Sequence, residues 1–235
     1  MDEHNEKKFG VPGAIVVGAV IIGLAIVFTF GSRGSVGTGS TAETNAQPTI
    51  EEAAKKVGVN QKDLAACIAE DRHAEKIQGH MDNAQAIGFQ GTPHSVVISH
   101  TTDKKITVSG AQPIENLRAL IETIDTDAVK ADPNDLAFNV TARQPGDHVR
   151  GSQHPTITII EYSDIDCPFC SRFHSTMKQL LAENENIQWI YRHTPIAGLH
   201  PEAYTKALAT ECVYELSDEN DETFWKYIDL LFGVK

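Results

Sequence analysis

A pair of cysteines at the start of a predicted helix constrains this chain more than any other feature. Residues 156–161 (TITIIE) are rich in β-branched residues, which predicts a buried strand. After a short turn, Cys167-Pro168-Phe169-Cys170 opens a segment whose apolar residues repeat at helical spacing. A helix N-terminus carries unpaired N–H groups and a partial positive charge, so it favours a thiolate over a thiol. The stretch therefore predicts a strand, a turn and a helix with both sulfurs on its first turn.

The spacing of the two cysteines suits dithiol–disulfide exchange. Cys167 lies nearer the helix start and is the expected nucleophile, and two intervening residues bring Cys170 close enough to resolve a mixed disulfide. Pro168 gives up no helical hydrogen bond on the first turn. No histidine separates the cysteines, so the helix terminus and the Pro168-Phe169 dipeptide are expected to set the redox poise.

A structural cysteine pair or one half of a zinc site is the alternative interpretation. Zinc needs two further ligands at comparable spacing, whereas the other two cysteines, Cys67 and Cys212, are far apart and the ten histidines are scattered. We therefore expect neither a metal nor a cofactor. The net charge of −12 also argues against a nucleic-acid surface.

The N-terminal part of the chain predicts a membrane anchor. Residues 11–30 form an uncharged apolar run, long enough to cross a bilayer as a helix. Two lysines precede it, which favours a cytoplasmic tail at residues 1–10 and an extracytoplasmic domain at the cell membrane. Residues 31–48 are rich in Gly, Ser and Thr and are expected to be a flexible linker. A cleaved signal peptide is the alternative, but the run is long for one and no convincing cleavage site follows, so an uncleaved signal-anchor is favoured.

The remaining sequence predicts alternating helices and strands. Thr49 and Glu52 form a capping-box pattern, and Pro93 heads a β-branched strand, where a missing N–H is tolerated. The expected helices are 50–57, a segment capped by Asn60, 74–87, 114–124, 167–181, 203–216 and 224–232. The expected strands are 95–99, 105–109, a short edge strand at 136–140, 157–161 and 187–191.

Three segments resemble the DsbA-like thiol–disulfide oxidoreductases. They are Glu161-Tyr162-Ser163-Asp164 before the cysteine motif, Gly91-Thr92-Pro93 before a strand, and Phe224–Phe232 (FWKYIDLLF). The resemblance implies an α/β fold with a thioredoxin-like mixed sheet of four to five strands and a helical cap. The Thr92-Pro93 bond would then be the cis-proline of the loop that faces the redox pair, although a trans bond is commoner on base rates.

The resemblance also implies an arrangement for the elements. Strand 157–161 would lie in the middle of the sheet, with 187–191 parallel on one side and 95–99 antiparallel on the other. Helices 167–181 and 114–124 would cover the faces of this sheet. The helical segments 50–87 and 203–232 would form the cap.

The order of the two halves is the reverse of the order in the family. Residues 49–125 resemble the C-terminal, cis-proline half, and residues 136–235 resemble the N-terminal half with the CxxC motif. Residues 126–135 form a polar connector between them. A circularly permuted domain at 49–235 is the favoured interpretation, because permutation succeeds where the original termini lie close together. A fragment of a tandem duplication is the alternative.

The resemblance assigns roles to residues around the redox pair. Glu161 would be a buried acid that takes up the proton of the resolving thiol, and burial would raise its pKa; the alternative is a strand-end carboxylate that reaches water. Thr92 and Pro93 would hold an extended peptide of the substrate. Asp164 and Asp166 are expected to cap the redox helix.

Cys67 and Cys212 each lie on the apolar face of a cap helix. Some relatives have a structural disulfide between the corresponding helices, and the resemblance implies that disulfide here. Two free buried thiols that behave as small hydrophobic residues are the alternative.

The expected function is that of a membrane-anchored, extracytoplasmic thiol–disulfide oxidoreductase that forms disulfides in exported proteins. Its expected partners are cysteine-containing exported polypeptides and a membrane redox partner that recycles the dithiol. A disulfide isomerase or reductase of the same fold is one alternative. A membrane-tethered binding module without turnover is the other.

Overall fold

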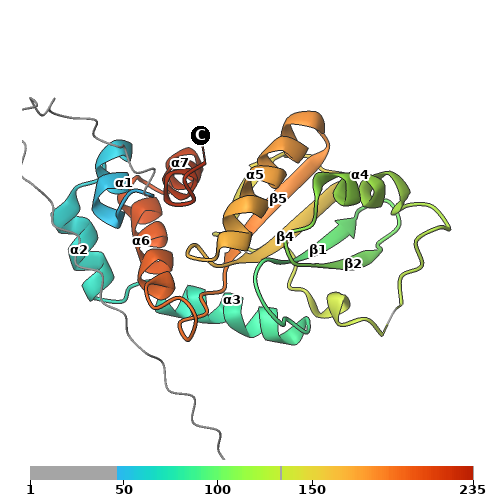
Figure 1. Ribbon diagram of the computed structural model, residues 1–235, viewed down its shortest axis with the longest axis horizontal. Helices are drawn as coiled ribbons and strands as arrows, with labels where there is room; N and C mark the ends of the chain where they lie inside the picture. The colour runs from blue at the N-terminus through green and yellow to red at the C-terminus, as the bar shows by residue number, and fades with distance from the viewer. Residues whose placement is uncertain (1–46, 133, 235) are drawn as a thin grey trace, which may run out of the picture. The chain divides into compact units, whose positions relative to one another are not determined.

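A five-stranded mixed sheet in the order β2-β1-β4-β5-β3 forms the centre of the computed structural model (Figure 1). β4 pairs in parallel with β5 and antiparallel with β1, and β2 extends the sheet beyond β1. This arrangement is the predicted one, and β3 adds an antiparallel edge strand beside β5. The strands are β1 (His94–Ser99), β2 (Lys105–Ser109), β3 (His148–Gly151), β4 (Ile157–Ser163) and β5 (Ile187–His193).

The structure describes residues 47–132 and 134–234. The predicted cytoplasmic tail, the predicted anchor at 11–30 and nearly all of the predicted linker lie outside this part. Within the described ranges no helix has both the length and the apolar character that a membrane crossing requires. The described residues belong to a unit that spans Thr44–Lys235.

Helix boundaries follow local capping signals. Thr49 and Glu52 make the predicted capping box, and Gly58, in the left-handed conformation, ends the first helix. Asn60 accepts hydrogen bonds from the first turn of the second helix, also as predicted. The helices are α1 (Ile50–Val57), α2 (Gln61–Ala69), α3 (Ala74–Ala86), α4 (Ile114–Thr123), α5 (Pro168–Glu183), α6 (Ala203–Leu216) and α7 (Asp221–Leu231).

The edge strand predicted at 136–140 is wrong. Residues Leu136–Asn139 form a short 3₁₀ helix, η1, whose first turn is capped by the Asp135 carboxylate through the Ala137 N–H (2.8 Å). Ala137 and Val140 are buried against the sheet. Apolar residues three apart suit one turn of helix as well as a short strand, so the alternation of apolar residues did not distinguish the two.

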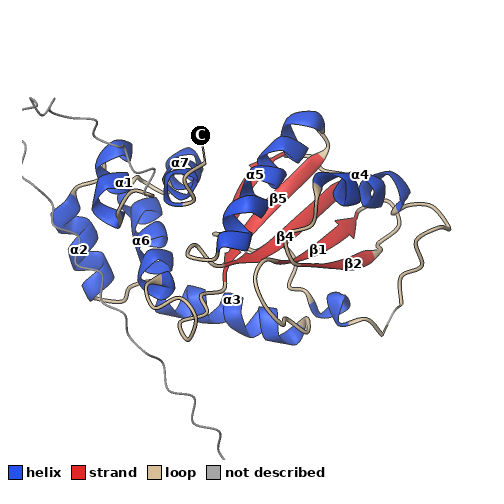
Figure 2. Cartoon of the chain, in the orientation of Figure 1, coloured by secondary structure: helices blue, strands red, loops and turns tan. Residues whose placement is uncertain are grey.

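The two faces of the sheet are covered differently from the prediction. α4 and α5 both pack on one face, where Leu117, Phe173 and Met177 share a core with Ile159 and Trp189. The opposite face is covered by α3 and η1 (Figures 1 and 2). α3 was expected in the helical cap, but it runs from the cap helices α1, α2, α6 and α7 along the sheet. The cap is therefore smaller than predicted, and it meets the sheet beside the N-terminus of α5.

Candidate active site

The two cysteines occupy different environments at the start of α5. Cys167 is the N-cap residue and Pro168 is the first residue of the helix, so the predicted boundary is confirmed within one residue. Cys167 is buried apart from 5% of its surface, and Cys170 is fully buried. Between them the Phe169 ring is half-exposed. Both sulfurs are free thiols in the structure.

These environments drive the acidities of the two thiols apart. Hydrogen bonds from the Cys170 thiol, from Thr92 and from backbone N–H groups of the first turn lower the pKa of Cys167 to about 5, although burial opposes the shift. Burial raises the pKa of Cys170, and the neighbouring Cys167 and Glu161 raise it further. At neutral pH the outer sulfur is therefore a thiolate and the inner one a thiol, which is the distribution that a nucleophile and a resolving thiol need.

The cis-proline loop lies against the redox pair. The Thr92-Pro93 peptide bond is cis, and the Cys167 thiol lies 3.5 Å from the Thr92 carbonyl oxygen. Residues 75 positions apart in the sequence are thus in contact. Beside this loop is a cavity of about 340 Å³. Its wall is formed by Gln90, Gly91, Thr92, His94, Ser109, Gly110, Ala111 and Phe169.

Glu161 lies on β4 behind the redox pair and is fully buried. Its Oε2 accepts a hydrogen bond from the Trp189 indole N–H (2.9 Å), whereas its Oε1 has no hydrogen-bond partner among the described residues. Burial raises the pKa of Glu161 to about 7, against the opposing effects of Ser163 and Trp189. The carboxyl does not reach water, so it lies where the resemblance implies a buried acid.

Asp164 and Asp166 do not cap the redox helix as predicted. Cys167 is the N-cap residue and no side chain caps this terminus. The Asp164 carboxylate accepts the N–H of Asp166 (2.8 Å) and that of Ile196 (2.7 Å). Asp166 forms an ion pair with Lys206 on α6. The two carboxylates therefore tie the active-site loop to the segment that follows β5 instead of opposing the thiolate.

His200 is a site residue that the sequence analysis did not single out. Its Nδ1 lies 2.9 Å from the buried Asp164 carboxylate. The Asp164 hydrogen bond raises the pKa of His200, and the negative charge of Cys167 adds to the effect. Another loop therefore places a titratable imidazole near the thiolate, although no histidine separates the cysteines. The sequence alone does not show that His200 lies near the thiolate.

Cys67 on α2 and Cys212 on α6 are joined in a disulfide. Their Cα atoms are 6.0 Å apart, within the range that a disulfide spans. His73 lies close enough to both sulfurs for the three side chains to hold a metal ion. With the sulfurs bonded to each other, however, the group offers no thiolate ligand.

Comparison with known proteins agrees with this geometry. Residues 37–122 match the model of the DSBA-like thioredoxin domain, and residues 143–235 match a thioredoxin model. No solved structure matches.

The curated relatives are much longer proteins. The chain is 36% identical over 87 residues to the Na(+)/H(+) antiporter NhaA 1 of Salinispora arenicola and 34% identical over 87 residues to NhaA 3 of Salinispora tropica. Each match covers 37% of this chain and 13% of the relative. NhaA 1 of Mycolicibacterium vanbaalenii is 32% identical over 90 residues, 34% of this chain and 15% of that protein. The chain thus spans only a small fraction of the length of these relatives.

The two family matches agree with the five-stranded sheet and with the facing cis-proline and CxxC motifs. The chain thus has a thioredoxin-like α/β fold in which a segment similar to the DSBA-like thioredoxin domain precedes a segment similar to thioredoxin, an order consistent with circular permutation.

Proposed function

We propose that this protein is a thiol–disulfide oxidoreductase that forms disulfides in cysteine-containing polypeptides. The observation that carries the proposal is the acidic Cys167 thiol in contact with the Thr92-Pro93 loop, with the far less acidic Cys170 thiol behind it. A binding module without turnover has no need of two thiols with such different acidities.

The reaction runs through a mixed disulfide. A substrate thiolate attacks Sγ of Cys167 in the oxidised pair, so that a substrate–Cys167 bond forms and the Cys167–Cys170 bond breaks. Cys170 leaves as a thiolate and takes up a proton, for which Glu161 is the neighbouring donor. A second substrate thiolate then attacks the substrate sulfur of the mixed disulfide and releases Cys167 as a thiolate. The substrate gains a disulfide, and its two electrons remain in the reduced pair.

The substrate is proposed to bind as an extended peptide beside the cis-proline. Backbone groups of Thr92 face the reactive sulfur, and an extended chain can add to such a backbone as a short strand. The adjoining cavity and the half-exposed Phe169 ring offer an apolar surface to neighbouring side chains. Hydrophobic segments of unfolded polypeptides fit this surface.

Oxidation is favoured over reduction or isomerisation by the acidity of Cys167. A low thiol pKa stabilises the reduced form, and it also makes Cys167 a good leaving group. Both effects make the disulfide form a strong oxidant. A disulfide isomerase or reductase of the same fold is the second candidate, because direction also depends on the redox partner.

The cellular setting is proposed from the sequence. An anchor at 11–30 and an extracytoplasmic domain would place the dithiol where disulfides persist. The substrates would then be exported polypeptides, and a membrane redox partner would reoxidise the pair.

Refolding of a reduced, unfolded disulfide protein tests the proposal. The full chain in detergent, with its pair oxidised, is mixed with the reduced substrate, and disulfides are counted after an acid quench. We expect the substrate to gain disulfides as the pair becomes reduced. The Cys167→Ser and Cys170→Ser variants, which cannot form the redox disulfide, should transfer none. If the unmodified protein binds the reduced substrate but transfers no disulfide to it, the oxidoreductase proposal is wrong and a binding module without turnover is the remaining interpretation.

A further inference from the structure

A line of buried polar side chains leads away from the redox pair between β4 and β5. Glu161 is paired with Tyr191, and Ser163 with His193, across these parallel strands. Residues two apart on a strand point to the same face, so all four side chains lie on one face of the sheet. Each of them is at least 99% buried.

Most of the polar atoms in this line lack a partner. Within the described residues, Oε1 of Glu161, Oγ of Ser163, the hydroxyl of Tyr191 and Nδ1 of His193 make no hydrogen bond. Buried polar groups are seldom left unpaired, because each loses its hydration without compensation. Four such atoms in one line are more than packing alone explains.

The members of the line lie close to one another. Ser163 follows Glu161 by two residues on β4 and is paired with His193 on β5, and its hydroxyl lowers the pKa values of Glu161, Cys170 and Tyr191. The rings of Tyr191 and His193 are 5.2 Å apart, edge to face. The four side chains thus follow one another from the resolving thiol to His193.

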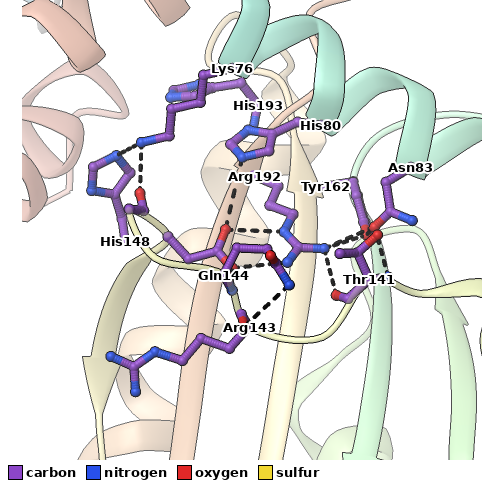
Figure 3. Close-up of polar contacts among 12 residues, drawn as sticks. Lys76, His80, Asn83, Thr141, Arg143, Gln144, His148, Tyr162, Arg192 and His193 are labelled. Atoms are coloured by element: carbon purple, nitrogen blue, oxygen red, sulfur yellow. Dashed lines mark hydrogen bonds and ion pairs between the residues drawn. The ribbon is translucent and has the colours of Figure 1, made fainter.

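Beyond His193 the line reaches a charged cluster that opens to solvent. His193 Nε2 lies 3.0 Å from Glu211 Oε1, and the other carboxylate oxygen, Oε2, lies 3.0 Å from His148 Nε2 and 2.7 Å from Lys76 Nζ. Figure 3 shows Lys76 reaching from α3 toward His148. The Lys76 side chain is 25% exposed and borders a cavity of about 290 Å³.

A second exit lies on the other side of the His148 ring. His148 Nδ1 is 3.2 Å from the Asp221 carboxylate, which is 44% exposed. Both routes to solvent, through Lys76 and through Asp221, therefore begin at Glu211 and the His148 ring.

The charge states along the line suit proton transfer. Burial lowers the pKa of His193, so its ring is neutral at pH 7 and one nitrogen can accept a proton. Although burial opposes it, His148 and Lys76 hold the pKa of Glu211 well below its usual range. A neutral imidazole thus lies between Glu161, whose pKa is raised to about 7, and Glu211, whose pKa is well below its usual range.

We propose that Ser163, Tyr191 and His193 form a proton path between Glu161 and the solvent-linked Glu211. The inference deepens the proposed function and rests on it. When Cys170 attacks Cys167 in a mixed disulfide, the new S–S bond forms and the substrate sulfur leaves as a thiolate. The Cys170 proton passes to Glu161, and the path carries it outward. In the direction of substrate oxidation the same path delivers the proton inward.

Several other ionisable groups face Tyr191 and His193 and must be considered in any pH profile. They are Glu161 on β4 and Asp164 after it, Cys170 on α5, Lys76 and His80 on α3, His148 on β3 and Glu211 on α6.

Tyr191→Phe is the sharpest test, because it removes one hydroxyl that has no partner and keeps the ring. The reduced full chain in detergent is mixed with oxidised glutathione, and acid quench with mass spectrometry separates formation of the Cys167 mixed disulfide from its resolution. Positioned proton transfer contributes on the order of 10²–10⁴-fold, and we expect loss of one link to slow resolution by about tenfold. Formation of the mixed disulfide, which needs only the Cys167 thiolate, should keep its rate.

Two further variants separate a proton path from a packing effect. Tyr162→Phe is the matched control, because Tyr162 is a buried β4 tyrosine on the opposite face with hydrogen bonds to Asn83 and Arg192. It should leave both rates unchanged. His193→Gln should slow resolution as Tyr191→Phe does, and the double variant should be no slower than either single variant, because links in series are not additive.

The outcomes distinguish the two proposals. No mixed disulfide in the unmodified protein would overturn the proposed function. If the unmodified protein resolves the mixed disulfide, and Tyr191→Phe and His193→Gln resolve it at the same rate between pH 5 and 9, the proton path is wrong and the proposed function still holds. Equal slowing of both steps would assign these residues a structural role and would also overturn it.

Discussion

Cys167 and Cys170 are the same residue type three positions apart, yet the structure gives their pKa values opposite shifts. Cys167 is the N-cap residue, and backbone N–H groups and Thr92 interact with its sulfur. Cys170 is buried inside the protein, near the buried carboxyl group of Glu161. The motif alone predicted the direction for Cys167. It did not predict how strongly the surroundings of Cys170 would oppose ionisation, because Glu161 comes from another element.

The acidity of Cys167 has a consequence for reactivity. Its pKa of about 5 predicts that alkylation by iodoacetamide reaches half of its maximal rate near pH 5. An ordinary cysteine does so near pH 8.5. Measuring the rate from pH 3 to 9 tests this, with Cys167→Ser as the control that should react slowly throughout. A midpoint above pH 8 would contradict it.

The same shift links stability to pH in the reduced protein. Because folding lowers the pKa of Cys167, its ionisation stabilises the folded state fully above pH 9, and this stabilisation is lost as the pH falls toward 5. The unfolding free energy of the reduced protein, relative to that of Cys167→Ser, should therefore decrease over this range. Chemical denaturation at pH 9, 7 and 5 measures the difference, and a constant difference would contradict the prediction.

Glu161 should act in the opposite sense. Folding raises its pKa from 4.5 to about 7, so the carboxyl stabilises the folded state below pH 4.5 relative to higher pH, and that advantage is lost as the pH rises through 7. Glu161→Gln removes the titration and keeps an oxygen for the Trp189 N–H. We expect it to raise the unfolding free energy at pH 8 by about 3 kcal/mol relative to its effect at pH 4. Denaturation of both proteins at the two pH values decides this, and an effect independent of pH would show that Glu161 does not titrate in the folded state.

At the scale of elements, strands and capped helices could be predicted from the sequence because local signals define them. Strand β4, the capping box of α1 and the Asn60 cap of α2 all depend on residues close together in the chain. The errors were at β3, a short edge strand that was not predicted, at η1, where a short apolar segment suits two conformations, and at α3, which packs on the far face of the sheet. A helix pattern shows which face is apolar but does not show what covers it.

The candidate site was predictable to the same extent. The cysteine motif is local, and Thr92, Pro93 and Glu161 came only from the family resemblance. His200 and the line from Ser163 to Glu211 were missed, because their proximity depends on how β5, α3 and α6 pack around the sheet.

The disulfide between α2 and α6 is an element-scale feature with a measurable effect. Cys67 and Cys212 are 145 positions apart, so the bond closes a long loop in the unfolded chain. Replacing both by Ala should lower the unfolding free energy by about 2–5 kcal/mol and leave disulfide exchange at Cys167 intact. Urea denaturation and the exchange assay measure the two effects. Loss of exchange together with unchanged stability would contradict this role.

At the scale of the whole molecule, the reversed order of the halves leaves the sheet complete. The connector from α4 to η1 joins the DSBA-like segment to the thioredoxin segment. The parallel pair β4–β5 lies beside the antiparallel pair β1–β2 in one sheet. The ends of the described part also meet: the Gln47 side-chain amide donates a hydrogen bond to the Phe232 carbonyl oxygen (3.3 Å). Termini that lie this close are the condition under which the order of segments can be exchanged without changing the fold.

This proximity predicts that the family's order can be restored. A chain in which Val234 is joined to Gln47 by a short Gly-Ser linker, and which opens between residues 130 and 131 of the connector, should fold to the same structure. The rearranged chain keeps every contact between the redox pair and the cis-proline loop. Because the new linker and the opened connector are both short, we expect the unfolding free energy to change by no more than about 2 kcal/mol. Denaturation, Cys167 alkylation and sedimentation compare the two proteins, with a chain opened inside β4 as the control that should fail to fold. If the halves belonged instead to separate copies of a tandem protein, the rearranged chain would form concentration-dependent dimers or lose the acidic thiol, because Thr92 and Cys167 would then meet only between molecules.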